Sequence, residues 1–184
     1  MAEFSKPDQE RRDRLTIGLH WATAILVAIQ FVIGKTAPLL PRSPLRVDIW
    51  SMHVVFGFVL CLVILAGVFW RWMRGRDPAT DGGALHALAS LTHHLLEVLL
   101  IIIAALGVLN VFAHAFPLFN AVDFPRLGDL RLMRRINAWH ALTANILIVI
   151  ALFHGAAALF HHYVLRDDVL RRMWPGFGGR EVGR

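Results

Sequence analysis

Four long apolar stretches, separated by short polar segments, make up most of this chain of 184 residues. Each reaches the length of roughly 20 apolar residues that a helix needs to cross a bilayer, at residues 15–34, 50–70, 91–112 and 136–165. None alternates between apolar and polar positions as the strands of a membrane barrel do. The pattern therefore predicts an all-α membrane protein, with residues 1–184 folded as a single four-transmembrane-helix bundle.

Prolines mark the connections between the stretches. A proline lacks the N–H group that a helix interior needs and disfavours the helical backbone in the residue before it. The first and last connections contain Pro38, Pro41, Pro44, Pro117 and Pro125. The last connection is also long enough for a separate short helix at the membrane surface, over residues 130–135.

Four of the ten histidines lie inside the apolar stretches: His20 in the first, His53 in the second, and His140 and His154 in the fourth. The last two are 14 residues apart, which on a helix is about 21 Å of rise and about 40° short of four full turns. Their rings therefore point in nearly the same direction at two depths. An imidazole in hydrocarbon is costly and is usually retained for function.

The depths of these histidines match in two pairs. His53 lies at the level of His140, and His20 lies at the level of His154. Two facing imidazoles are suitable axial ligands for a haem, and they leave no open position on iron, which suits electron transfer better than oxygen binding. We therefore predict two b-type haems with bis-histidine ligation. They would be bound non-covalently, because the single cysteine, Cys61, forms no C-x-x-C-H motif.

Other interpretations of these residues stay open at this point. The histidines could link helices through hydrogen bonds, and a metal-ion transporter would need carboxylates in the spans, where only Glu97 is available. Small residues near the histidines, Gly18, Gly57, Gly107 and Gly155, fit either the space a porphyrin needs or ordinary helix packing.

A second group of titratable residues is expected at the end of the bundle nearest the termini. His161 continues the seven-residue spacing that relates His140 to His154, and His93 lies near the start of the third stretch, one turn from Glu97. Histidine exchanges protons near neutral pH. We therefore interpret His93, His161 and Glu97 as candidate catalytic residues where a redox carrier meets protons at the membrane surface. The alternative is that they are ordinary polar residues of the interface.

The distribution of charge predicts the orientation in the membrane. With both termini in the cytoplasm, 12 of the 19 Lys and Arg residues lie on the cytoplasmic side, as the positive-inside rule favours. The formal net charge of +6 reflects basic residues that flank membrane spans, so it does not indicate binding to nucleic acid. We predict a multi-pass protein of the bacterial inner membrane, surrounded by lipid.

The two loops predicted on the opposite side are also basic, with a combined net charge of +4. Clefts of one charge sign attract small ions of the other sign. The loops would therefore attract a small anion, although the same residues could simply contact lipid headgroups. Their basic side chains are Arg42, Arg46, Arg126, Arg131, Arg134 and Arg135.

Five motifs are spread over the whole chain. They are R-L-x-I-x-x-H-W at 14–21, M-H-V-x-x-G at 52–57, W-H-x-x-x-A-N at 139–145, H-x-A-A-A-L-x-H-H-Y at 154–163 and D-x-x-L-x-R-M-x-P at 167–175. Together they resemble the bacterial cytochrome b561 family, and within it the di-haem members that oxidise superoxide. The resemblance implies His20 and His154 as ligands of the cytoplasmic haem, and His53 and His140 as ligands of the periplasmic haem.

The resemblance also implies a ubiquinone site near His93 and His161, with Gly18 beside it, and electron transfer from periplasmic superoxide to ubiquinone. An alternative is a membrane cytochrome b subunit that links a dehydrogenase or hydrogenase partner to the quinone pool. Two positions depart from the family pattern, since Gly18 replaces a serine and Glu97 replaces an aromatic residue.

Overall fold

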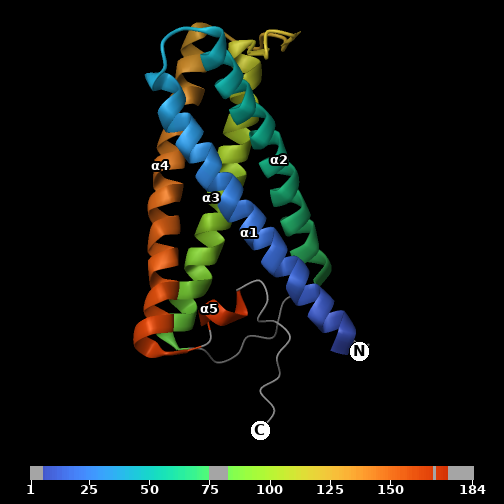
Figure 1. Ribbon diagram of the computed structural model, residues 1–184, viewed down its shortest axis with the longest axis vertical. Helices are drawn as coiled ribbons and strands as arrows, with labels where there is room; N and C mark the ends of the chain where they lie inside the picture. The colour runs from blue at the N-terminus through green and yellow to red at the C-terminus, as the bar shows by residue number, and fades with distance from the viewer. Residues whose placement is uncertain (1–5, 75–82, 168, 174–184) are drawn as a thin grey trace.

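The computed structural model describes residues 6–74, 83–167 and 169–173. Four α-helices of 31 residues each form a bundle (Figure 1), which confirms the predicted fold: α1 Lys6–Thr36, α2 Pro44–Arg74, α3 Ala84–His114 and α4 Leu130–Phe160. Helices of this length measure about 46 Å, against about 30 Å for the hydrocarbon core of a bilayer. Each helix therefore extends past its apolar stretch into the headgroup region.

Short elements lie at the two ends of the bundle. One end carries the 3-10 helix η1 Ala37–Leu39 and the antiparallel strands β1 Pro117–Leu118 and β2 Val122–Asp123, and is called the hairpin end below. The other end carries the π-helix η2 His161–Leu165 and the helix α5 Val169–Arg172, and is called the terminal end.

The fourth helix is continuous from Leu130, so the prediction of a separate surface helix over 130–135 is wrong. Asp129 caps this helix, because its side chain accepts a hydrogen bond of 2.7 Å from the N–H of Leu132. Such a cap satisfies one of the free N–H groups of the first turn. No proline or glycine follows before Gly155, so the helix runs from the surface into the membrane without a break.

The helices pack as neighbours in the order of the chain, α1 on α2, α2 on α3 and α3 on α4. Figure 1 shows that all four converge at the hairpin end, whereas α1 and α2 diverge from α3 and α4 toward the terminal end. The small core includes Leu60, Ile64 and Leu147. Large apolar side chains such as Phe153, 73% exposed, cover the outside of the bundle, where lipid takes the place of water.

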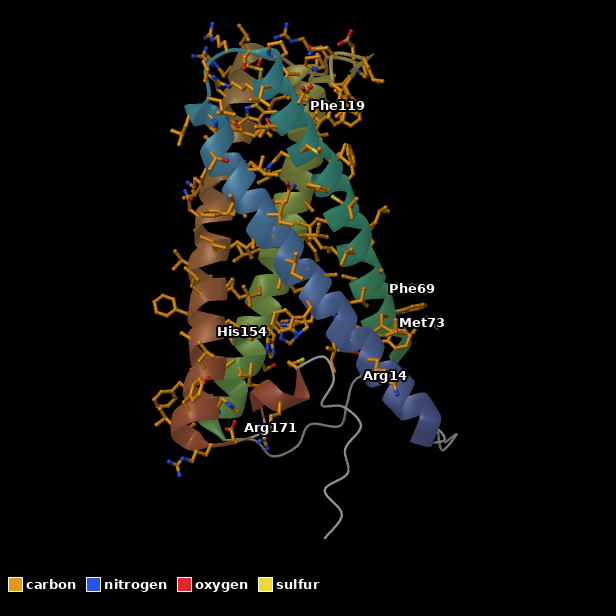
Figure 2. The ribbon with its side chains drawn as sticks, in the orientation of Figure 1. Arg14, Phe69, Met73, Phe119, His154 and Arg171 are labelled. Atoms are coloured by element: carbon orange, nitrogen blue, oxygen red, sulfur yellow. The ribbon has the colours of Figure 1, made fainter. Side chains whose placement is uncertain are left out.

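A buried serine fastens the hairpin to the second helix. Ser51 in α2 is 0% exposed, and its Oγ accepts a hydrogen bond of 2.8 Å from the N–H of Phe119 while donating to the carbonyl of Val47 at 2.9 Å. Phe119 and Asn120 adopt left-handed backbone angles, with φ of 51° and 53°. Figure 2 labels Phe119 at this end. The turn thus depends on one side chain from another element.

We expect Ser51→Ala to destabilise the hairpin end, because the N–H of Phe119 loses its acceptor. A polar group left without its partner costs about 1–3 kcal/mol. Hydrogen exchange in detergent should become faster over residues 117–123, and the unfolding temperature should fall. Ser43→Ala is the matched control, since among the described residues the Ser43 hydroxyl bonds within its own turn, to the carbonyl of Pro41 and the N–H of Arg46. Unchanged exchange in Ser51→Ala would contradict the role given to this side chain.

Candidate functional site

Two histidines face each other near the hairpin end. The ring centres of His53 in α2 and His140 in α4 are 6.2 Å apart, and their planes are inclined at 77°. Both side chains are half-buried. The helices that carry them are not neighbours along the chain, so the packing of the whole bundle produces this pair.

A second pair lies nearer the terminal end. The ring centres of His20 in α1 and His154 in α4 are 6.3 Å apart, and their planes are inclined at 70°. Figure 2 labels His154, which points from α4 into the bundle. His20 is exposed and His154 is half-buried. The two pairs thus have nearly the same geometry at two levels.

This geometry fits one metal ion between the two rings of each pair. A metal–imidazole bond is about 2 Å long, and the ring centre lies roughly 1 Å behind the nitrogen, so two axial imidazoles place their ring centres about 6 Å apart. Within the described part of the chain, no group of three or more metal-ligating side chains occurs. Two histidines would be enough to hold the iron of a haem, because the porphyrin would supply the other ligands. The partners are those that the sequence depths indicated; their ligation of iron stays a prediction.

Two buried side chains of α4 lie between the two levels. Thr143 and Leu147 lie between His140 and His154 on the sequence, and they are the two buried residues of this helix, with Leu147 only 3% exposed. The 14-residue spacing corresponds to about 21 Å along the helix axis. Because Leu147 shares the stripe of the two histidines, both rings point toward the same interior.

Glycines lie against the two rings near the hairpin end. A Cβ atom at Gly34 of α1 would lie 3.5 Å from Cε1 of His53, and one at Gly107 of α3 would lie 3.3 Å from Cε1 of His140. The Nδ1 atoms of both rings are buried and have no hydrogen-bond partner among the residues that the structure describes. The Cε1–Nδ1 edge of each ring therefore faces the neighbouring helix.

The four glycines singled out from the sequence have different surroundings. Gly107 contacts His140, and Gly57 faces the side chain of Gln30, whereas an added Cβ at Gly18 or Gly155 would meet nothing within 4 Å. Sequence reasoning missed Gly34. The signal available in the sequence was its depth in the membrane: Gly34 ends the first apolar stretch, and His53 lies near the start of the second.

The candidate catalytic residues at the terminal end each have a different partner. The ring of His93 in α3 lies 5.0 Å from that of His154. Glu97 Oε1 forms an ion pair of 2.5 Å with Arg71 Nη2 of α2. That His93, Glu97 and His161 act at one site stays a prediction.

His161 begins the π-helix η2, and its Nδ1 lies 2.5 Å from Oδ2 of Asp167. π-Helical turns occur frequently at functional sites. The chain leaves this turn at Arg166, which has a left-handed φ of 54°. The contact between His161 and Asp167 depends on that turn, and nothing in the spacing of the two residues predicts it.

The segment after α4 crosses the terminal end of the bundle. Figure 1 shows α5 lying between the lower parts of α4 and α1. Trp21 Nε1 of α1 donates a hydrogen bond of 2.6 Å to the carbonyl of Met173. This contact joins α1, which carries His20, to the segment that follows His161. The sequence placed Trp21 in a motif but gave no sign of its partner.

The predicted basic residues gather at the hairpin end. Arg46 is half-buried and donates to the carbonyl of Leu40 at 3.2 Å. The acidic residues Asp48, Asp123 and Asp129 are exposed at the same end, so the positive charge there is partly offset. The exposed arginines are Arg42, Arg126, Arg131, Arg134 and Arg135.

Comparison with known proteins identifies the family. The model of the prokaryotic cytochrome b561 family matches residues 11–176. The chain belongs to this family. It is 30% identical to cytochrome b562 of Cereibacter sphaeroides over 171 residues, which are 87% of this chain and 92% of that protein. It is 26% identical to the probable superoxide oxidase CybB of Yersinia pestis over 170 residues, which are 88% of this chain and 94% of that protein.

A further relative is cytochrome b561 homolog 2 of Escherichia coli, 29% identical over 175 residues, which are 89% of this chain and 91% of that protein. Together with the four membrane-spanning helices, family membership makes this chain a multi-pass protein of the bacterial inner membrane. Like the family, it is a haem-binding four-helix bundle, and it carries b-type haem and transfers electrons.

Proposed function

We propose that this cytochrome is a superoxide oxidase that holds two haems and passes electrons from periplasmic superoxide to ubiquinone. The observation that carries the proposal is the repeated geometry of the histidine pairs, with ring centres 6.2 Å and 6.3 Å apart at two levels of one bundle. His53 and His140 would hold one haem, and His20 and His154 the other. When bound, each haem supplies a one-electron carrier, and the protein supplies ligands and environment.

The electron balance needs two superoxide ions for each quinone. Each superoxide loses one electron and becomes dioxygen, and ubiquinone takes up two electrons and two protons to become ubiquinol. We place the hairpin end in the periplasm and both termini in the cytoplasm, as the distribution of Lys and Arg favours. Superoxide would then react at the hairpin end, and protons would be taken up at the terminal end.

The terminal end offers groups suited to a quinone. Carbonyl oxygens of a quinone accept hydrogen bonds, and the reduced product needs protons from a group that titrates near neutral pH. Asp167 lies against Nδ1 of His161, so Nδ1–H donates a hydrogen bond to the carboxylate. The other ring nitrogen, Nε2, is then the one that would contact the quinone. His93, beside His154, is the second donor to the quinone head. Glu97, held by Arg71, lies one turn from His93.

The hairpin end offers an electrostatic field suited to superoxide, a small monoanion. Its exposed arginines lie in and beside the loops that flank the His53–His140 pair. A field of one sign raises the encounter rate of an oppositely charged ion by roughly 10–1000-fold, and salt weakens it. The similarity to a protein named probable superoxide oxidase supports the same donor.

We expect His53→Ala and His140→Ala each to remove the haem near the hairpin end, and His20→Ala and His154→Ala each to remove the other, because a bis-histidine iron loses an axial ligand. Haem per protein, measured by the pyridine haemochrome method, should fall from two to one. His162→Ala is the control, since His162 contacts Tyr163 rather than a histidine of either pair. Two haems per chain in His140→Ala would contradict the pairing. Loss of the second haem in His93→Ala but not in His20→Ala would assign that ligand to α3.

We expect His161→Ala to slow ubiquinone reduction at least tenfold while both haem spectra stay intact, because the proton donor is lost. General acid catalysis contributes about 10²–10⁴-fold. Asp167→Asn should slow it less, since the imidazole remains but its orientation is no longer held by a charge. The measurement is steady-state turnover of the purified protein over a range of quinone concentrations. Wild-type turnover of His161→Ala at every concentration would rule out this role.

We expect superoxide-dependent haem reduction to slow as the salt concentration rises past about 0.1 M, where the Debye length is about 10 Å. Reversing two charges, Arg131→Glu and Arg134→Glu, should slow it further at low salt. The matched control is reversal of Arg171, which is exposed at the opposite end. Rates that depend on neither salt nor these arginines would argue against superoxide. Quinone reduction only after addition of a dehydrogenase partner would favour an electron-transfer subunit.

A further inference from the structure

Gln30 of α1 reaches across to the backbone of His53 in α2. Its Nε2 donates a hydrogen bond of 2.8 Å to the carbonyl of His53. In a helix the carbonyl of residue i points toward residue i+4, and that residue is Gly57, which has no side chain to block the approach. A Cβ at Gly57 would lie only 2.9 Å from Gln30 Nε2. The glycine therefore opens the place that the amide of Gln30 occupies.

A glycine of α1 also makes room for a side chain of α2. Gly34 is four residues after Gln30, and the ring of His53 lies against it, with Cε1 3.5 Å and Nδ1 3.9 Å from an added Cβ. The carbonyl of Gln30 points along α1 toward Gly34, on the side where this ring lies. Nδ1 of His53 is buried and has no hydrogen-bond partner among the residues that the structure describes.

The two contacts form a reciprocal clamp between α1 and α2. The side chain of Gln30 holds the backbone of His53, and Gly34, one turn after Gln30, lies against the side chain of His53. On the other side of the proposed haem, the ring of His140 lies against Gly107 in the same way, with Ile103 four residues earlier. Ile103 has no side-chain amide, so it cannot bond to the backbone of His140 as Gln30 bonds to the backbone of His53. The clamp is therefore particular to one of the two ligands.

We propose that Gln30 is a positioning residue for the haem held by His53 and His140, acting through His53. Residues that bond to a metal ligand fix its orientation and tune the metal. By holding the backbone of His53, Gln30 sets the orientation in which the His53 ring would meet the iron, and with it the reduction potential of that haem. This inference rests on the proposed ligation of iron by His53.

Two substitutions remove the clamp from opposite sides. Gln30→Leu deletes the amide, and Gly57→Ala places a methyl group where the amide lies. Gly67→Ala is the matched control in the same helix, because a Cβ there meets nothing within 4 Å. Outer-shell partners of metal ligands typically contribute about 10–100-fold to metal affinity. We expect haem transfer to apomyoglobin to become at least tenfold faster for one haem in both clamp variants, and to be unchanged in Gly67→Ala.

Spectroscopy separates positioning from helix packing. We expect Gln30→Leu and Gly57→Ala to shift the midpoint potential and the low-spin electron paramagnetic resonance signal of one haem and to leave the other haem unchanged. The affected haem is the one that remains in His20→Ala. A purely structural link between α1 and α2 would lower the unfolding temperature but leave the potential and the signal at their wild-type values. That result would overturn the proposal.

A double substitution tests the contact itself. In a Gln30→Ala background the methyl group of Gly57→Ala has no amide to displace, so we expect the second substitution to add little to the effect of the first. Fully additive effects would overturn the clamp. His53→Ala keeps the two proposals distinguishable: retention of both haems in this variant rejects the ligation. Loss of one haem in His53→Ala, together with wild-type spectra in Gln30→Leu, rejects only the role of Gln30.

Discussion

An imidazole ring inside hydrocarbon needs a polar or metal partner, and this constraint organises the bundle. The fourth helix carries two such rings on one stripe, with the buried Leu147 between them. Two other helices each bring one histidine to the matching level, His53 from α2 and His20 from α1. The third helix supplies the surface behind one ring through Gly107. Each of the four helices therefore contributes a histidine or a contacting glycine to the two histidine pairs.

The two ends of the bundle are held together differently. At the hairpin end the helices converge (Figure 1), Ser51 fastens the turn, and the ring of Phe124 lies 6.5 Å from that of Phe58 and 5.5 Å from that of Phe112. At the terminal end the helix pairs diverge. There the hydrogen bond from Trp21 to Met173 connects α1 to the segment that follows α4. The converging end suits the His53–His140 pair, whose rings must keep their orientation during electron transfer. A more open end suits a substrate as large as a quinone head.

Two interhelical hydrogen bonds made by polar side chains lie near the His53–His140 pair. Gln30 bonds to the backbone of His53, and Asn110 Nδ2 bonds to Asn137 Oδ1 at 3.3 Å, close along the chain to Gly107 and His140. Interhelical hydrogen bonds and glycine contacts are the usual means of holding helices together where lipid removes the hydrophobic driving force. In this protein the same contacts that join helices also surround the candidate ligands.

The sequence by itself determined the four spans and the depths of the histidines, because apolar length and the fixed rise of a helix depend only on neighbours along the chain. It was wrong about a separate helix over 130–135, where the cap at Asp129 starts one continuous helix. Only the tertiary structure decided that Gln30 meets His53, that His161 meets Asp167 and that Arg71 meets Glu97. Such contacts depend on how each helix is rotated about its axis and where the last turn of α4 ends, which follow from packing rather than from the spacing of residues.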